Sequence, residues 1–245
     1  LSHTSGVADY FEGPVHTGSR FTSLVVQEPN TFWTPQALVD FFRHNQKPYG
    51  PPGAFHYSDT GFVLLGLIIE RISGKAFHEC LVEDIFTPCA MDNTNLLFYS
   101  QSHNQDRAPL KPVMLGRTDI TSFTSLSCDW AGGGIATTLE DALLFQQALY
   151  GGRLVSASTL AELQKPLNRF RSGIHYGMGM MEIHFEEFFF LLRGFPRLVG
   201  HLGILATHFF YDRDTDTHYI MNFGGTRAMG TSFQTLSRII GLQKK

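Results

Sequence analysis

The order of local patterns along the chain predicts an α+β fold. Helical patterns come first, extended patterns follow from about residue 174, and one more helical pattern ends the chain. Helices and strands that are segregated rather than alternating indicate an antiparallel sheet flanked by helices, together with a mainly helical lobe. We expect a single domain, 1–245, with the helical lobe at 1–170 and the sheet and C-terminal helix at 171–245.

The composition is that of a globular protein. The 245 residues are 43% hydrophobic and 17% charged, which allows a sizeable core. A net charge of −3 gives no reason to expect nucleic acid or an anionic membrane as a partner. The odd number of cysteines, Cys80, Cys89 and Cys128, has no metal-ligand spacing and predicts buried thiols. No segment approaches the ~18 apolar residues of a membrane span, and no signal peptide is present.

The helical patterns carry recognisable start and stop signals. Thr34 and Pro35 predict the N-cap and first residue of a helix over 34–46, whereas 7–33 show no sustained period. Residues 58–72 are apolar on every side, so we expect a buried helix that Ser73-Gly74 ends. A further helix is expected at 76–86, and 90–130 look like an irregular connection.

A second group of helices follows the glycine-rich segment at 131–134. Thr137 and Glu140 have the spacing of a capping box for a helix that ends at Gly151-Gly152. A shorter helix is expected at 157–165, before Pro166, and a last helix at 232–240.

The strand patterns lie between these helices. The segments 175–185, 197–212 and 217–224 read as strands, with 213–216 as a hairpin turn. His208 and His218 are expected to be cross-strand neighbours.

The triplet Tyr57-Ser58-Asp59 has two interpretations. Ser58 and Asp59 are good helix caps, so the triplet can simply start a helix. Alternatively, the Tyr57 hydroxyl is held near a nucleophile and shuttles a proton, which requires a nearby cation to lower the tyrosine pKa from ~10. The triplet alone favours the first interpretation.

Two further segments are ambiguous by themselves. The stretch 200–203 can be a strand whose glycines allow close packing, or a strand edge that supplies half of an oxyanion hole beside His201. No Lys-Ser/Thr follows the glycines at 131–134, which argues against a phosphate loop and for close backbone packing. His78-Glu79 lacks the second histidine of a zinc motif, so we expect no metal and no cofactor.

Four segments in order resemble the serine β-lactamase-related family: "LSHTSGVADY", "PPGAFHYSDTGFVLLGLIIERISGKAFHE", "WAGGGIATTLEDALLF" and "GHLG". This family includes class C β-lactamases, D-alanyl-D-alanine carboxypeptidases and related esterases. The resemblance runs from Leu1 to about Gly225 and implies the serine β-lactamase and penicillin-binding-protein-like fold. Each motif is only moderately specific, but their shared order makes chance similarity improbable.

The resemblance also implies roles for individual residues. In such enzymes an S-x-x-K serine is acylated, and the proton-shuttling tyrosine falls on Tyr57. Asp59 stands where Asn is usual, which puts the pairing of the lysine in doubt. The third motif falls on His201-Leu202-Gly203, in a form closer to peptidases and esterases. The Ile204 N–H becomes an oxyanion donor, and the substrate-binding residues implied are Ser58, Gly132, Gly133, Leu202 and Gly203.

The chain departs from the family pattern at the nucleophile. No S-x-x-K occurs in the sequence, because Ser73-Gly74-Lys75 has the wrong spacing. We expect the motif upstream of Leu1, in a longer gene product; a cleaved protein and a true pseudo-enzyme are the alternatives. By resemblance, the intact protein hydrolyses an ester or amide of a small molecule or peptide, such as a D-amino-acid peptide.

Two rival functions stay open at this point. A non-catalytic binding module would use the same cleft, lined by Tyr57, His201 and the glycines at 131–134. A metal-dependent hydrolase is the weaker rival. Relatives are commonly exported, but the compartment and the oligomeric state are left open by the sequence.

Overall fold

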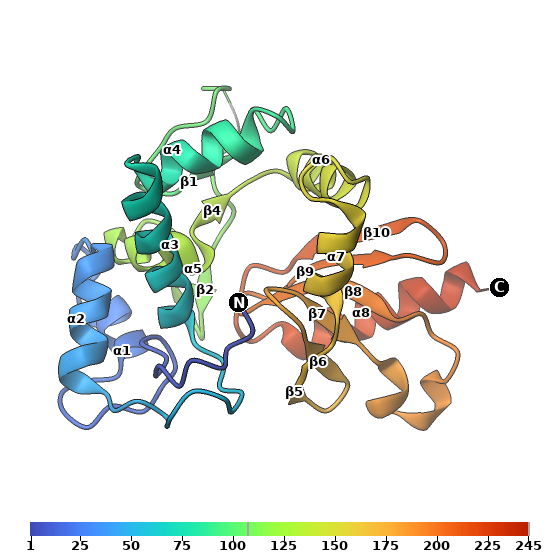
Figure 1. The fold of residues 1–245 in the computed structure, drawn as a ribbon, viewed down its shortest axis with the longest axis horizontal. Helices are drawn as coiled ribbons and strands as arrows, with labels where there is room; N and C mark the ends of the chain where they lie inside the picture. Colours follow the sequence, from blue (N-terminus) through green and yellow to red (C-terminus); the bar gives the residue numbers. More distant parts are fainter. Residues whose placement is uncertain (107, 245) are drawn as a thin grey trace. The chain divides into compact units, whose positions relative to one another are not determined.

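The computed structural model describes residues 1–106 and 108–244. Contacts within the chain group it into two compact units: 1, 3–110 and 120–145 form the first, and 2, 111–119 and 146–245 form the second. Figure 1 traces helices in the first unit, and an antiparallel sheet with helices in the second. The predicted α+β fold is confirmed, whereas the assignment of 1–245 to a single domain stays a prediction.

The first unit is mainly helical. Its strands β1 and β4 form a short antiparallel pair. Helix α6 crosses the division between the units at 145–146. The elements in chain order are α1 (Phe21–Gln27), α2 (Pro35–Asn45), α3 (Asp59–Ser73), α4 (Phe77–Leu81), the π-helical η1 (Val82–Phe86), β1 (Asn95–Leu96), the 3-10 helix η2 (Thr124–Asp129), α5 (Trp130–Gly133), β4 (Ile135–Ala136) and α6 (Leu139–Tyr150).

Local capping explains where these helices begin and end. The Thr34 side chain accepts a hydrogen bond from the Ala37 N–H at the start of α2, as predicted. Gly74 ends α3 in the left-handed conformation with φ of 70°, which glycine adopts without steric cost. The helix predicted at 76–86 is confirmed, but its second half is a π-helical turn.

The cap predicted at Thr137 is displaced by one residue, and the predicted capping box does not close. The side chain of Thr138, not Thr137, accepts a hydrogen bond of 3.2 Å from the Asp141 N–H. The Asp141 carboxylate does not return to the cap but accepts hydrogen bonds of 2.7 Å from the Asn93 N–H and the Thr94 hydroxyl. Thr137 and Thr138 are adjacent, and either could be the N-cap by its residue type. The hydrogen bonds of Asp141 with Asn93 and Thr94 decide that Thr138 caps α6.

Helix α3 is less buried than its sequence predicts. Val63 and Gly66 are buried, but Ile68 is 49% exposed and Ile72 is 82% exposed. The prediction of a fully buried helix is therefore wrong for its second half. An apolar pattern on every side shows that a helix can be buried, but the number of neighbouring elements decides how many of its faces are covered.

Gly66 marks the covered face of α3. A Cβ atom at Gly66 would lie 2.7 Å from the Ala131 Cβ and 2.8 Å from a Trp130 ring carbon, so α3 and α5 approach more closely than any side chain allows. The close approach is therefore made at Gly66 of α3. Of the glycines for which the sequence predicted close backbone packing, Gly132 has only an ordinary contact at 3.7 Å and Gly133 has no neighbour within 4 Å of an added Cβ atom. Gly61, also in α3, has no such neighbour within 4 Å.

These two glycines give a matched test of the packing. Replacing Gly66 with alanine should lower the free energy of unfolding by about 1–3 kcal/mol, because the added methyl overpacks the interface. Replacing Gly61 with alanine should raise it by up to about 1 kcal/mol, since alanine favours the helix. Urea unfolding followed by circular dichroism measures both, and equal effects of the two substitutions would contradict the packing described.

The second unit is built on a six-stranded antiparallel sheet in the order β10-β9-β8-β7-β6-β5. Helix α8 buries Leu236 and Ile240, and its Ser232 hydroxyl lies 2.7 Å from Nε2 of His208 on β9. The elements are β2 (Met114–Leu115), β3 (Thr118–Asp119), α7 (Ala157–Gln164), β5 (Asn168–Arg171), β6 (Ile174–Tyr176), β7 (Met181–Ile183), η3 (Phe185–Glu187), η4 (Phe190–Leu192), β8 (Leu198–Gly203), β9 (Thr207–Asp212), β10 (Thr217–Asn222) and α8 (Met229–Gln243).

The register of the sheet corrects two predictions. The segment predicted as one strand at 197–212 is two strands, β8 and β9, joined by a turn in which Ala206 has a φ of 57°. His218 pairs with Tyr211, and His208 pairs with Met221, so the two histidines are not cross-strand neighbours. Their positions are set by the tight turn at 213–216, which fixes the register of β9 and β10.

Other elements were missed or shortened by sequence reasoning. Helix α1 and strand β5 have no clear periodic pattern, and α8 is longer at both ends than the predicted 232–240. All three cysteines are buried thiols, as predicted. Among the described residues, no helix has the length and apolar character needed to cross a bilayer.

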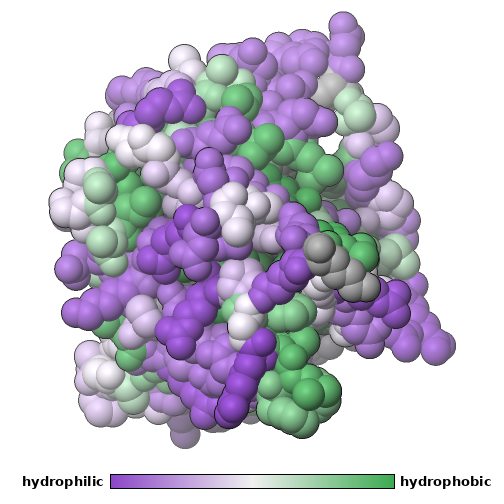
Figure 2. All heavy atoms as spheres, turned by 90° about the vertical axis from the view of Figure 1, so that its right-hand side faces the viewer, coloured by the Kyte–Doolittle hydropathy of each residue, from purple (hydrophilic) through white to green (hydrophobic). Residues whose placement is uncertain are grey.

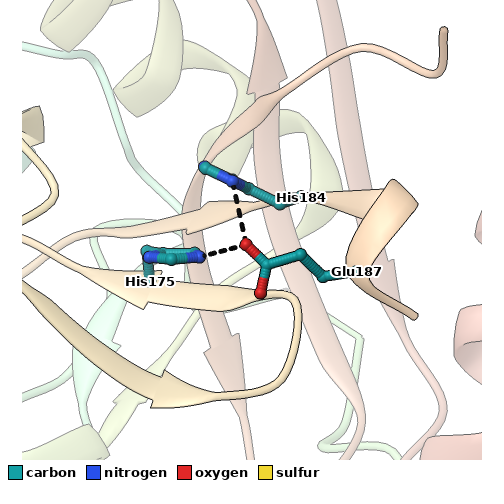
Figure 3. A group of neighbouring side chains, drawn as sticks. All are labelled: His175, His184 and Glu187. Atoms are coloured by element: carbon teal, nitrogen blue, oxygen red, sulfur yellow. Dashed lines mark hydrogen bonds and ion pairs between the residues drawn. The ribbon is translucent and has the colours of Figure 1, made fainter. Parts of the chain in front are cut away.

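The surface of the second unit is mixed. Figure 2 shows that hydrophilic residues cover most of this side of the molecule and that hydrophobic residues gather in patches near its lower edge. The most exposed apolar residues of the η3–η4 segment are Phe189, Phe190 and Leu191, at 51%, 64% and 65%. This segment follows the side chains His175, His184 and Glu187 shown in Figure 3.

Candidate functional site

The Tyr57-Ser58-Asp59 triplet lies where the chain turns from an extended segment into α3. Ser58 is the N-cap and is 1% exposed. Its hydroxyl donates a 3.1 Å hydrogen bond to the Ala8 carbonyl and accepts one of 3.4 Å from the Gly61 N–H. The Ser58 hydroxyl is therefore held by backbone groups. These hydrogen bonds fix the positions of the residues on either side of Ser58.

Tyr57 is oriented by its neighbours in the first unit. Its ring packs on the imidazole of His3, with the ring centres 4.2 Å apart. The Nδ1 atom of His3 accepts a hydrogen bond of 3.1 Å from the Ser58 N–H. The Tyr57 side chain forms a hydrogen bond with the Asp59 carboxyl group. A half-buried phenol thus lies beside an acidic group at the start of a helix.

Asp59 belongs to a group of acidic residues. The Asp59 N–H donates a 3.2 Å hydrogen bond to Oδ1 of Asp9. Burial, followed by the charges of Asp9 and Asp129, raises the pKa of Asp59 well above its usual value. Burial also raises the pKa of Asp9, and that of Asp129 to about 6.

No cation balances these carboxyl groups within 1–106 and 108–244. The ion pairs of the described residues involve other carboxylates, mainly Glu83, Glu182 and Glu187. Buried carboxyl groups are usually paired or hydrogen-bonded, since isolated buried charge is costly. This group of three is therefore a place where a positive charge would be stabilised.

The glycine-rich segment lies next to the acidic group. A Cβ atom at Gly132 would lie 3.7 Å from the Asp59 Cβ, in ordinary contact. A Cβ atom at Gly133 would have no neighbour within 4 Å. The structure thus brings together four of the residues singled out from the sequence, namely Tyr57, Ser58, Asp59 and Gly132.

The segment His201-Leu202-Gly203 is the second half of β8, in the second unit. All of β8 pairs with β9, from Leu198 to Gly203. The ladder with β7 ends at the pair Met181–Gly200. Among the described residues no strand continues along this side of β8, so 201–203 form a local sheet edge.

The end of this strand is tightly packed. A Cβ atom at Gly203 would lie 3.1 Å from the Thr207 Cβ, so the turn between β8 and β9 favours glycine there. Ile204 is the first residue of this turn, and it is 41% exposed.

His201 is a neutral imidazole with both nitrogen atoms in hydrogen bonds. Its Nδ1–H donates to the Leu202 carbonyl at 3.0 Å, because a carbonyl can only accept. Its Nε2 is therefore the acceptor for the Tyr176 hydroxyl, at 3.2 Å. Burial lowers the pKa of His201 to about 4. Tyr176 was not identified from the sequence, in which it is one apolar residue of a strand.

The protonation state of His201 is directly testable. We expect its imidazole resonances to titrate with a midpoint near 4, because burial disfavours the charged ring. Two-dimensional 1H–15N NMR of the imidazole region, with His201→Gln for assignment, measures this. A midpoint close to the ordinary histidine value of ~6.5 would contradict the buried, neutral ring.

A different group of titratable side chains lies elsewhere in the second unit. His175, His184 and Glu187 each offer an atom that could bind a metal, and these atoms lie within 4.8 Å of one another (Figure 3). Sequence reasoning missed this group, because the segment predicted as one strand at 175–185 is two strands, β6 and β7, whose pairing brings His175 close to His184 and Glu187.

The helical unit, the antiparallel sheet and the two motifs define a serine β-lactamase-type protein. The chain belongs to the Beta-lactamase family, whose model matches residues 1–229.

Particular relatives make the comparison more specific. Penicillin-binding protein 4* of Bacillus subtilis is 26% identical over 216 residues, which are 83% of this chain and 45% of the relative. The D-aminopeptidase of Brucella canis is 25% identical over 208 residues, 83% of this chain and 36% of the relative. The chain thus spans less than half the length of these curated relatives.

A solved structure gives the same result for the fold. The crystal structure of D-amino acid amidase from Ochrobactrum anthropi, complexed with L-phenylalanine amide, matches with a TM-score of 0.76 at 26% identity. The match covers 100% of this chain and 70% of the amidase. The predicted serine β-lactamase and penicillin-binding-protein-like fold is confirmed.

Proposed function

We propose that this protein hydrolyses an amide bond next to a D-amino acid through a serine acyl-enzyme. The relatives that support this proposal are a D-aminopeptidase and a D-amino acid amidase, the latter also solved with D-phenylalanine. For this reason we propose an amide rather than an ester as the substrate. The observation that carries the proposal is the Tyr57 side chain, held at the start of α3 by its hydrogen bond with Asp59 and its contact with His3.

In the proposed reaction Tyr57 moves one proton twice. The Tyr57 oxygen takes the proton of the serine hydroxyl while the serine oxygen attacks the amide carbonyl. The same proton then passes to the nitrogen of the leaving amine as the carbon–nitrogen bond breaks. Water, deprotonated in the same way, releases the acid product and regenerates the serine.

The end of β8 is proposed to stabilise the negative oxygen of this reaction. The Ile204 N–H would donate to that oxygen, together with the N–H of the nucleophile. His201 is proposed to act as a neutral positioning residue, because both of its nitrogen atoms hold the strand end and Tyr176. Leu202, Gly203 and Gly133 would line the substrate, and Ser58 would position Tyr57.

The buried carboxyl groups of Asp9, Asp59 and Asp129 support the lysine that the proposed reaction requires near Tyr57. An S-x-x-K lysine brings a positive charge, which would favour the ionised form of a tyrosine and would be stabilised by Asp9, Asp59 and Asp129. The sequence of 245 residues contains no S-x-x-K. The proposal therefore needs residues that these 245 do not include.

The test compares two proteins, residues 1–245 and the product of the longer coding sequence read upstream of Leu1. A fluorophosphonate probe should label one serine in the longer protein and none in 1–245, as determined by intact mass. The longer protein should hydrolyse D-phenylalanine amide faster than L-phenylalanine amide. Labelling of 1–245 would refute the position of the nucleophile, and an upstream sequence without S-x-x-K would favour a binding module.

A further inference from the structure

The group shown in Figure 3 arises from the register of β6 and β7. His175 pairs directly with Glu182 across these strands. His184 follows Glu182 by two residues, so its side chain projects on the same face. Glu187 comes from η3, which folds back toward β6. Side chains from β6, from the end of β7 and from η3 therefore meet on one face of the sheet.

The distances are close to those of a metal site. Glu187 Oε1 lies 2.7 Å from His175 Nε2 and 3.4 Å from His184 Nδ1. Tetrahedral zinc with bonds of ~2.0–2.1 Å holds its ligand atoms about 3.3 Å apart. To admit the ion, the 2.7 Å separation would have to widen by about 0.6 Å. The two imidazole rings, which stack with their centres 4.1 Å apart at an interplanar angle of 28°, would also have to rotate so that their lone pairs converge.

The contact between His184 Nε2 and Glu182 fixes which nitrogen atom of the His184 ring faces Glu187. His184 Nε2 lies 2.7 Å from Oε1 of Glu182, which is itself held by Arg213 at 3.1 Å. The Nε2–H must donate there, because a carboxylate oxygen accepts. In the neutral ring the lone pair of Nδ1 then faces Glu187 Oε1, and two acceptors face each other. A cation or a proton must lie between them.

The carboxylate is fixed from its other side. Glu187 Oε2 accepts hydrogen bonds from the Gly173 N–H at 3.2 Å and from Arg169 at 3.0 Å. The Ser172 hydroxyl donates to the Glu187 carbonyl at 3.1 Å. These contacts direct Oε1 toward the two imidazoles. The Arg169 charge opposes a cation, but its side chain is 60% exposed, so water screens it.

We propose that His175 Nε2, His184 Nδ1 and Glu187 Oε1 bind a divalent transition metal, with Zn²⁺ as the preferred ion. Two imidazoles and one carboxylate suit zinc better than calcium or magnesium. The hydrogen bond from His184 to Glu182 is the outer carboxylate contact typical of such sites. The fourth position would hold water. Binding requires an unprotonated Nε2 on His175, so this ring takes the Nδ1–H form.

The metal would fasten η3 and the apolar segment after it to the strand pair β6–β7. This proposal departs from the expectation of no metal, because the sequence pattern did not reveal that η3 returns to the sheet. It is independent of the proposed hydrolysis.

The test uses the tag-free chain after removal of metal with EDTA. Titration with Zn²⁺ against a chromophoric chelator at pH 7.5 should give one ion per chain. Co²⁺ should give the intense visible absorption of a four- or five-coordinate site. His175→Ala and Glu187→Gln should weaken binding more than about 100-fold, and Glu182→Gln by about 10- to 100-fold.

The control is His103→Ala, which removes an exposed histidine that lies 3.2 Å from Asp92 and belongs to no group of three metal-binding side chains among the described residues. It should leave the affinity unchanged. Equal affinity in wild type, His175→Ala and Glu187→Gln, or no stoichiometric Zn²⁺ in wild type, would overturn the proposal and leave a proton on His184. If the variants do not fold, X-ray absorption of the zinc-bound wild type decides, since fewer than two imidazoles on the ion would exclude this site.

Discussion

If the longer coding sequence supplies the S-x-x-K motif that the proposed function requires, replacing Tyr57 with phenylalanine should lower kcat of its product by about 100- to 10,000-fold, with little change in KM. General acid–base catalysis contributes this much to turnover. The phenylalanine keeps the ring that packs on His3 and removes only the oxygen that hydrogen-bonds with Asp59. Steady-state kinetics with D-phenylalanine amide measures the effect.

Tyr99→Phe is the matched control in the same unit. The Tyr99 hydroxyl donates a 3.4 Å hydrogen bond to the Trp33 carbonyl, so its loss should leave kcat unchanged. Combining Tyr57→Phe with His201→Ala tests whether both residues serve one reaction, since their effects should then be less than multiplicative. A kcat for Tyr57→Phe within about threefold of wild type would exclude the proton-shuttle role.

Replacing Asp59 with asparagine should stabilise the protein at neutral pH by about 1–3 kcal/mol. The pKa of Asp59 is higher in the folded than in the unfolded protein, so the folded state binds more protons between the two values. Stability is then highest below the unfolded pKa and falls as the pH rises through the folded pKa. Asparagine keeps the shape of the protonated acid and cannot ionise.

The expected difference between variant and wild type is therefore small near pH 4 and largest above the folded pKa of Asp59. Urea unfolding at several pH values between 4 and 8 measures it. Asp84→Asn, at an exposed position in η1, is the control and should show no such dependence. Asp129, with a pKa of about 6, should retain a smaller loss of stability between about pH 4 and 6 in Asp59→Asn. A destabilised Asp59→Asn at pH 8 would show that the carboxylate is better paired than described.

Much of the fold could be predicted because its signals are local. Thr34 and Gly74 lie at helix ends where the capping hydrogen bond or the φ value involves only neighbouring residues, and the Ser58 hydroxyl likewise accepts from the nearby Gly61 N–H. The α+β order and the family resemblance followed from motifs of a few residues each. The same signals located Tyr57 and Asp59 beside one helix start, next to the glycine segment.

The rest depended on contacts between distant segments. The split of 197–212 into two strands and the register that separates His208 from His218 follow from a turn whose backbone conformation is not fixed by residue type alone. The hydrogen bond between Tyr176 and His201 joins β6 to β8, and the sequence pattern of neither strand indicated this contact.

The sequence by itself determined the types of element, their order and the family motifs, because capping, periodicity and glycine conformations act over a few residues. Only the tertiary structure decided which faces are covered and which acids meet. The exposed Ile72 and the acidic group around Asp59 result from how segments distant along the chain pack, and the His175–His184–Glu187 group results from the pairing of β6 with β7 and the return of η3. Packing and desolvation depend on neighbours far along the chain, and no local pattern encodes those neighbours.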